Sequence, residues 1–350
     1  MENSAVMKNT VIYTLLSILL IIVVIFSLGM GSISVSFWDV CSILLHKIGI
    51  KASSGIDELT VNVLEQIRLP RILMGIAVGA ALGISGAAIQ GIFRNPLAEP
   101  GLMGISSGAS FFAALVISFE GLLLPLISAS LGYYVLAFSA FLGATLTVLI
   151  VYRISMNNGK SHIATMLLAG VAMNAFAGAL TGLLSYLATE QQLRSITFWS
   201  LGSLAGASWE NIKVLYPCVL VSLVILPLFA KQLNVFALGE SQAEMMGVNT
   251  SRLKIVVILF STLAVGAAVA FSGVISFVGL LVPHAIRLIG GVDNRYVLIA
   301  SSIAGALVLT LADLLSRMII QPLELPIGVI TALLGTPVFL FILIRDKNKI

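Results

Sequence analysis

One short stretch occurs twice in the chain: residues 77–86 read AVGAALGISG, and residues 264–273 read AVGAAVAFSG. Seven of the ten positions are identical, at an offset of 187 residues. Pro96 and Pro283 repeat this offset, and each is expected in the first turn of the apolar segment that follows, where proline is tolerated. Two matches at one offset indicate an internal repeat rather than a chance likeness between apolar words.

The composition places the chain in a membrane. Apolar residues make up 59% of the 350 positions and charged residues 10%, whereas soluble domains are about half apolar and a quarter charged. The charges cluster, and the stretches of about 17 to 25 residues between clusters are long enough to cross a bilayer as helices. The sequence therefore predicts an all-α polytopic membrane protein, with residues 1–350 forming a single transmembrane domain.

Ten spans are expected. Their approximate bounds are 11–30, 69–93, 101–119, 131–151, 163–188, 211–230, 254–272, 275–290, 297–317 and 325–344. The first span could be a cleaved signal peptide, because Lys8 precedes its apolar run. The run is about twenty residues long and no small-x-small cleavage site follows it, which favours an uncleaved helix.

The two copies of the repeat lie in the second and seventh spans, so they must cross the membrane in opposite directions. This predicts an inverted repeat with halves at about 65–190 and 252–345, an arrangement typical of transporters. Glycines 75, 79 and 83 in the second span, and 178 and 182 in the fifth, have the small-xxx-small spacing that lets helices approach closely in lipid.

The basic residues suggest an orientation. With ten spans both termini lie on one side, and assigning them to the cytoplasm places twelve of the nineteen Lys and Arg residues inside. Among those left outside are Arg68, Arg71 and Arg317. Because basic residues flank membrane spans for topological reasons, the net charge of +4 does not indicate a nucleic-acid partner.

The sequence offers no catalytic or metal-binding constellation. GKS at 159–161 resembles the end of a phosphate-binding loop, but such a loop needs glycine at position 154, which is Ile154. The three histidines are scattered, and Cys41 and Cys218 form no recognisable motif. The chain is therefore expected to be neither an enzyme nor a holder of a cofactor.

A few polar groups within the spans are candidates for function, because such groups are costly in hydrocarbon. Asp313 is the main one; Arg317 lies one turn further on and can neutralise it. The alternative is an ion-coupled secondary transporter that uses Asp313 as its ion site. Asn174 and Thr181 could line a pathway, and interhelical hydrogen bonds would explain them equally well.

The longest polar interruption is ALGESQAEMMGVNTSRLK at 237–254. Gly239 and Gly247 bracket a short helical stretch with Glu240 and Glu244 on one side and Met245 and Met246 on the other. Such an amphipathic helix in a cytoplasmic loop is typical of a docking element that enters a groove on a partner.

Several motifs together resemble a known family. They are RLPR (68–71), SGAAIQGIFRNPLAEPGLMGISSGA (85–109), LLAGVA (167–172), FWSLGSL (198–204), LGESQAEMMGV (238–248), GVISFVGLLVPHAIRL (273–288), LADLLSR (311–317) and ELPIGVITALLGTPVFLFIL (324–343). The chain from residue 65 onward resembles the permease subunits of type II ABC importers for ferric siderophores, haem and cobalamin.

The resemblance implies a multi-pass subunit of the bacterial cytoplasmic (inner) membrane with both termini cytoplasmic. It also implies a partner permease, expected to be a second copy, two cytoplasmic ATPase subunits that bind ATP and Mg, and an extracytoplasmic substrate-binding protein. Arg68, Arg71 and Arg317 match outer-surface arginines that pair with acidic residues of that binding protein.

The loop at 237–252 matches the family's coupling helices, which rest in clefts of the ATPases; the matching residues are Gly239, Glu240, Ala243, Glu244 and Gly247.

The resemblance further implies a cytoplasmic gate. Asn95 and Leu97 match one half of it, and Ile163 and Ala164 match the other, where some relatives carry small hydroxyl residues. The departure at 163–164 leaves the chemistry of that half open. FWSLGSL is more similar to haem-importing members, which favours haem or a ferric siderophore over cobalamin as the ligand.

Overall fold

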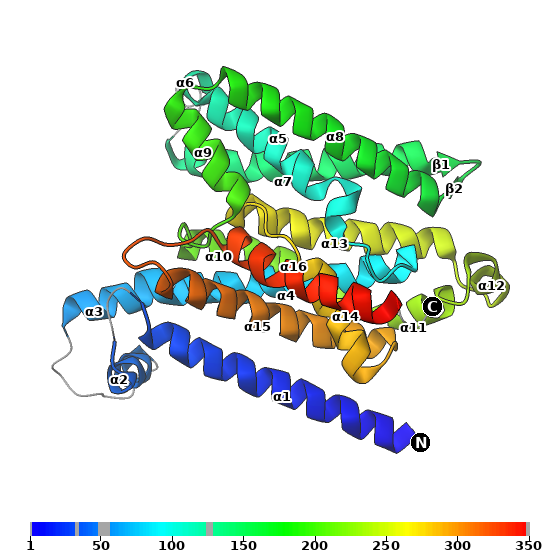
Figure 1. Cartoon of the computed structure of the whole chain (residues 1–350), viewed down its shortest axis with the longest axis horizontal. Helices are drawn as coiled ribbons and strands as arrows, with labels where there is room; N and C mark the ends of the chain where they lie inside the picture. Colours follow the sequence, from blue (N-terminus) through cyan, green and yellow to red (C-terminus); the bar gives the residue numbers. More distant parts are fainter. Residues whose placement is uncertain (1, 32–34, 48–56, 124–128, 348–350) are drawn as a thin grey trace.

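The computed structural model describes residues 2–31, 35–47, 57–123 and 129–347, most of which are helical (Figure 1). The first part contains α1 (Glu2–Gly29), α2 (Phe37–Lys47), α3 (Glu58–Asn62), the π-helix η1 (Val63–Arg68), α4 (Leu69–Phe93), the 3₁₀ turn η2 (Pro100–Met103), α5 (Ile105–Ser118), α6 (Glu120–Leu123) and α7 (Ala129–Ser155). A two-stranded hairpin, β1 (Met156–Asn157) and β2 (Lys160–Ser161), follows. The second part contains α8 (Ile163–Leu187), α9 (Glu190–Leu201), α10 (Trp209–Leu228), α11 (Ala230–Phe236), α12 (Glu240–Met245), α13 (Thr250–Ser272), α14 (Val278–Gly290), α15 (Asn294–Met318) and α16 (Ile327–Lys347).

The ten expected spans are confirmed as helices. Among the described residues, seven helices are long and apolar enough to cross a membrane, and α5, α14 and α16 supply three shorter apolar helices. With 14 and 13 residues, α5 and α14 reach only about 20 Å at 1.5 Å per residue. That is less than the roughly 30 Å bilayer core, so irregular backbone must complete both crossings.

The segment that precedes α14, residues 273–277, packs against the loop that follows α9. Ser203 donates its amide hydrogen to the Ser272 carbonyl at 2.8 Å, and a Cβ on Gly202 would lie 2.4 Å from the Val274 carbonyl oxygen. Non-helical backbone is tolerated at membrane depth when protein surrounds it in this way. The segment 273–277 is therefore stabilised by the loop that follows α9.

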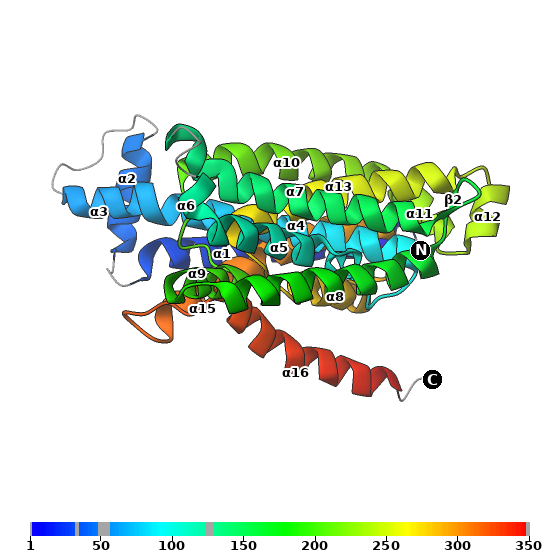
Figure 2. The same cartoon turned by 90° about the horizontal axis from the view of Figure 1, so that it is seen from above.

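Both described ends of the chain lie at one end of the helix bundle, together with α12 and the β hairpin, while α2, α3 and α6 lie at the other (Figures 1 and 2). We call these the inner end and the outer end. The helices α4 and α13, which carry the two copies of the repeat, run in opposite directions (Figure 1). An inverted repeat requires this geometry; the correspondence of the complete halves stays a prediction.

α4 is the central helix of the bundle. It is continuous with α3 and η1, and within the combined segment Glu58–Phe93 the most apolar stretch of 18 residues is 89% buried. Its glycines let the backbone of α15 approach it closely, as the small-xxx-small spacing predicted. A Cβ on Gly79 would lie 2.3 Å from the Gly305 carbonyl oxygen, and one on Gly83 would lie 2.0 Å from that of Ser301. Only glycine fits at these two crossings.

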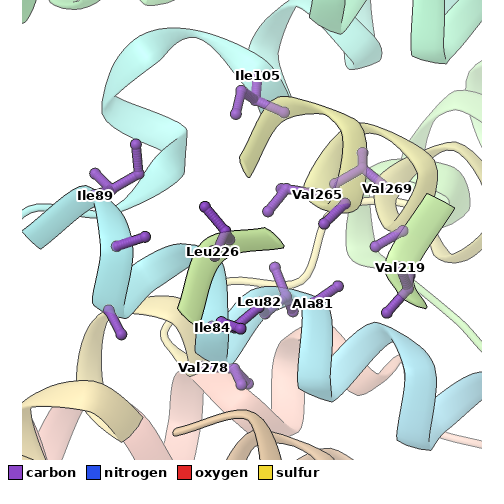
Figure 3. Packing of buried hydrophobic residues seen from close by; sticks show 14 of the residues in the cluster. Ala81, Leu82, Ile84, Ile89, Ile105, Val219, Leu226, Val265, Val269 and Val278 are labelled. Atoms are coloured by element: carbon purple, nitrogen blue, oxygen red, sulfur yellow. The ribbon is translucent and has the colours of Figure 1, made fainter. Parts of the chain in front are cut away.

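The two copies of the repeat contribute to the same apolar core (Figure 3). Ala81, Leu82 and Ile84 come from the first copy, and Val265 and Val269 come from the second. Ile89, one to two turns further along α4, and Ile105, Val219, Leu226 and Val278 from neighbouring helices surround them. The small residues of the repeat therefore serve packing at the centre of the molecule.

The expectation for Pro283 is wrong: it lies in the interior of α14, not in its first turn. Proline has no amide hydrogen, so the carbonyl of Gly279 four residues earlier loses its usual helical donor. This carbonyl faces α4 instead, where a Cβ on Gly86 would lie 1.9 Å from its oxygen. Pro283 and Gly86 together permit the contact between α14 and α4.

The prediction of close packing also fails for Gly178 and Gly182 on α8. A Cβ on either would meet no atom of the described chain within 4 Å. Only 22% of the most apolar 18-residue stretch of α8 is buried. Phe176, Leu183 and Tyr186 are exposed along this helix. The chain does not itself cover this face of α8.

Candidate functional site

At the inner end, α12 forms between two glycines with positive φ angles, Gly239 at 129° and Gly247 at 83°. L-residues with side chains rarely adopt these angles, so the glycines set both bends of the loop. Ala243 is fully buried and anchors the helix against the bundle. On the opposite side, Met245 is 80% exposed and Met246 62% exposed. The six-residue helix therefore presents an apolar surface at the inner end.

The acidic side chains of α12 form hydrogen bonds with lysines of neighbouring elements. Glu240 Oε1 accepts a hydrogen bond from Lys254 Nζ at 2.6 Å. Both carboxylate oxygens of Glu244 accept hydrogen bonds from Lys160 Nζ, at 2.9 and 2.8 Å. Thr250 adds a hydroxyl donor to Glu244 at 2.9 Å. The acids of α12 are thus paired within the chain.

The more exposed of these two ion pairs, Lys160 with Glu244, is charged throughout the neutral pH range. The hydrogen bond with Lys160 lowers the pKa of Glu244, and the same bond raises the pKa of Lys160. A carboxylate with a lowered pKa loses its stabilising effect only as the pH falls through that pKa. An ammonium with a raised pKa loses its effect only as the pH rises through that pKa.

The first half of the expected gate is the turn between α4 and η2. Arg94 ends α4 in the left-handed region with φ 50°. The side-chain oxygen of Asn95 accepts a hydrogen bond from the Leu97 amide at 2.9 Å, which closes the turn. Leu97 is 37% exposed. Asn95 therefore shapes the turn, and the exposed Leu97 is the apolar group that it presents.

The second half of the expected gate lies where α8 begins. Ile163 is the first residue of the helix and Ala164 is exposed beside it. Two turns into α8, a Cβ on Gly170 would lie 1.9 Å from the Leu102 carbonyl oxygen of η2. α8 therefore packs directly against η2, the element that follows the turn after α4, while the role of residues 95, 97, 163 and 164 as a gate stays a prediction.

Glu99, at the end of the same turn, is a source of pH dependence. Burial raises its pKa, and the described part of the chain provides no ion pair or side-chain hydrogen bond to it. Because the folded state disfavours its charged form, stability is lost as the pH rises from the ordinary carboxyl pKa of about 4.3 through the raised value. The buried charge is therefore a cost to folding at neutral pH and above.

We expect Glu99→Gln to raise the apparent Tm by about 2 °C at pH 8 and to leave it unchanged at pH 4. The reason is that glutamine keeps the shape and cannot ionise. Thermal unfolding of the purified protein in detergent measures both values. Glu58→Gln, at an exposed position of α3, is the matched control. An equal gain at both pH values would contradict the assignment to ionisation.

At the outer end the three arginines line one cavity, and two of them pair with carboxylates. Arg71 Nε lies 2.8 Å from Asp313 Oδ1, and its Nη1 lies 2.8 Å from Glu324 Oε2. Arg317 Nε lies 3.2 Å from Asp313 Oδ2, which confirms the expected pairing within α15. Arg68 donates to the carbonyl of Leu28. We call Arg68, Arg71, Arg317, Asp313 and Glu324 the outer ion cluster.

The resemblance implied arginines on the outer surface, and the structure corrects their exposure. Arg68, Arg71, Arg317 and Asp313 are all buried, whereas Glu324 is partly exposed. The three arginines and Glu324 line a polar cavity of about 140 Å³ at this end. That cavity gives access to the arginines, and their pairing with a binding protein stays a prediction.

Asn174 and Thr181 make hydrogen bonds that account for their polarity. The Asn174 amide nitrogen donates to the Gly101 carbonyl at 3.1 Å, and its oxygen accepts a hydrogen bond from Ser107. Thr181 donates to the Ala177 carbonyl of its own helix at 2.8 Å. Asn174 thus links α8 to η2 and α5, as expected if interhelical hydrogen bonds explain this polar residue. A role in lining a pathway stays untested for both residues.

Sequence reasoning missed three of the residues that build these sites. They are Lys160, Lys254 and Glu324. A signal existed for the lysines: Glu240 and Glu244 are one turn apart, where like charges repel, so nearby cations are favourable. Nothing in the sequence identified which of the inner basic residues would supply them.

The comparisons with known proteins agree with this architecture. A model of the FecCD transport family matches residues 19–345 of the chain. The chain belongs to the FecCD transport family. It is 40% identical over 341 residues to the hemin transport system permease protein HmuU of Yersinia pestis, with 96% of each chain covered.

Two further relatives are named for other transported compounds. This chain is 34% identical over 337 residues to the Fe(3+)-citrate import system permease protein YfmE of Bacillus subtilis, and the match covers 96% of this chain and 95% of the relative. It is 38% identical over 294 residues to the cobalamin import system permease protein BtuC of Halobacterium salinarum, covering 84% and 76%. Relatives with similar sequence identity to this chain are thus named for different transported compounds.

Among solved structures, one assigned to the metal-chelate type ABC transporters in an inward-facing conformation matches with a TM-score of 0.82. The two chains are 33% identical, and the match covers 95% of this chain and 99% of the solved chain. PsaBC from Streptococcus pneumoniae in complex with Fab matches at 16% identity and a TM-score of 0.51, which shows a shared fold only. This chain is a multi-pass membrane permease of the ABC importer class, as the resemblance predicted.

Proposed function

We propose that this chain is the permease subunit of a binding-protein-dependent importer that carries haem or a ferric siderophore into the cytoplasm. Two ATPase subunits at the inner end would supply the energy, and both termini would be cytoplasmic. The observation that carries the proposal is α12: a short helix fixed by two bends, exposing Met245 and Met246 at the inner end. An exposed apolar helix face of this kind suits a cleft on a partner.

A second copy of the chain is the proposed partner within the membrane. The support is the uncovered face of α8, where Gly178 and Gly182 meet no neighbour within 4 Å and large apolar side chains are exposed. A pathway between two copies would run along this face, beside Asn95 and Leu97 and the start of α8. Small residues there would leave room for a bulky cargo.

At the outer end, the proposed partner is the substrate-binding protein. The support is the cavity of about 140 Å³ at that end, whose lining includes Arg68, Arg71 and Arg317 together with Glu324, because guanidinium groups form strong hydrogen bonds with carboxylates. Such charge complementarity mainly orients a partner. The cargo class rests on the relatives, whose names include hemin, ferric citrate and cobalamin, all of them metal chelates.

Reconstituted vesicles test the function. We expect uptake of labelled hemin or a ferric siderophore only when the permease, the ATPase subunits, the binding protein and ATP are all present. Labelled cobalamin is expected to be taken up less well. Uptake by the permease alone, driven by an ion gradient and abolished by an uncoupler, would contradict the proposal and favour the ion-coupled alternative that uses Asp313.

A further inference from the structure

Lys254 connects three elements at the inner end with one charge. The residue lies in the second turn of α13, and its side chain is 1% exposed. Its ammonium group donates to Glu240 Oε1 on α12 at 2.6 Å and to the backbone carbonyl of Ser161 in strand β2 at 2.6 Å. A buried ammonium is costly unless its donors are satisfied, so both contacts are needed to keep it there.

Strand β2 is stiffly joined to the start of α8. The turn of the hairpin consists of Asn158 and Gly159, both with positive φ, which is the favoured geometry for a two-residue hairpin. The His162 amide then donates to the Ser155 carbonyl at 3.0 Å. Ile163 begins α8 two residues after Ser161. A force on Ser161 is therefore transmitted to the first turn of α8 without a flexible linker.

A second, weaker bridge runs parallel to the first. Lys160, next to Ser161, pairs with Glu244 at 2.8 Å, and both side chains are partly exposed. Exposed pairs contribute little stability, whereas removing one partner of a buried pair is strongly destabilising. The connection between α12 and the hairpin therefore depends mainly on Lys254.

We propose that Lys254 is a positioning residue that transmits movement of α12 to the inner end of α8, where Ile163 and Ala164 lie. We call Lys254, Glu240 and the Ser161 carbonyl the lysine clamp. The clamp gives the ATPases a direct mechanical route to one half of the gate. α8 can respond because most of its surface is not packed against the rest of the described chain. The inference rests on the proposed function of α12.

The test uses the complete importer with Lys254→Met, which keeps the length of the side chain and removes its charge. We expect ATP hydrolysis to stay within about twofold of the wild type and the amount of cargo taken up per ATP to fall at least fivefold, about 1 kcal/mol of lost coupling. Lys254→Arg should restore most of the ratio because it keeps the charge. Lys231→Met, an exposed lysine of α11 at the same end, is the control and should behave as the wild type.

The outcomes separate the two proposals. If the wild-type importer shows no ATP-dependent uptake, the proposed function fails. If the wild type is coupled and Lys254→Met keeps the same uptake per ATP, the lysine clamp is overturned. Loss of ATPase binding by Lys254→Met would also overturn it, because the lysine would then shape the docking helix. If Lys254→Met cannot be recovered from membranes, Glu240→Gln decides by the same ratio.

A distance measurement tests the clamp without transport. Spin labels at Met245 on α12 and Ala164 on α8, both exposed, should give one narrow distance distribution in the otherwise unmodified permease. We expect the distribution to broaden in Lys254→Met and in Glu240→Gln and to stay narrow in Lys231→Met. A narrow distribution in all variants would overturn the mechanical link.

Discussion

Gly83→Val is expected to prevent the protein from accumulating as a folded permease. The Cβ atom alone would lie 2.0 Å from the Ser301 carbonyl oxygen on α15, and valine adds two further methyl groups. Helix backbones cannot shift locally by that much, so α4 and α15 would have to separate along their crossing. Loss of close packing is severe in lipid, where no hydrophobic drive between helices compensates for it. We expect a cost of at least about 4 kcal/mol.

The measurement is the yield of monodisperse protein after detergent extraction, followed by the apparent Tm. Gly206→Ala is the matched control, because a Cβ there meets nothing within 4 Å and its φ angle is ordinary. We expect this control to extract as the wild type does. Normal yield and Tm for Gly83→Val would show that α4 and α15 are less closely packed than the structure describes.

The second large effect concerns the outer ion cluster. Asp313→Ala removes the carboxylate that lies between Arg71 and Arg317 and leaves two buried guanidinium groups without it. Removing one partner of a buried ion pair costs about 3 to 5 kcal/mol, because the remaining charge is uncompensated. Glu324 forms its ion pair with Arg71 and is 41% exposed in its side chain, so it does not replace a buried carboxylate that contacts both arginines.

The apparent Tm and the protease resistance of the purified Asp313→Ala protein check this expectation. Lys213→Ala is the control, since it removes an exposed pair with Glu210 at 2.9 Å, and exposed pairs contribute little. Asp313→Asn separates the two explanations considered for this residue. A loss of uptake with unchanged stability would indicate an ion-coupling site; a fall in stability indicates the structural pairing.

The sequence by itself determined the features that depend on local properties. Hydropathy sets the length of each span, so ten spans and two ends on one side followed from the chain alone. The repeat at 77–86 and 264–273 predicted antiparallel helices, and the spacing of Gly79 and Gly83 predicted the close crossing. Gly239 and Gly247 bracketed α12, because positive φ angles at a bend require glycine. These predictions needed no knowledge of distant neighbours.

Tertiary structure alone decided which distant groups meet. Lys160 pairs with Glu244 across 84 positions, and Arg71 pairs with Glu324 across 253. Pairing over such separations depends on how the helices pack, which single spans do not specify. The same packing buried the outer arginines, which the sequence had placed on the surface, and left Gly178 open, which it had expected to be packed. Whether a residue is buried depends on its neighbours in space. The residue pattern of one helix shows which of its faces are apolar, but not which other helix covers them.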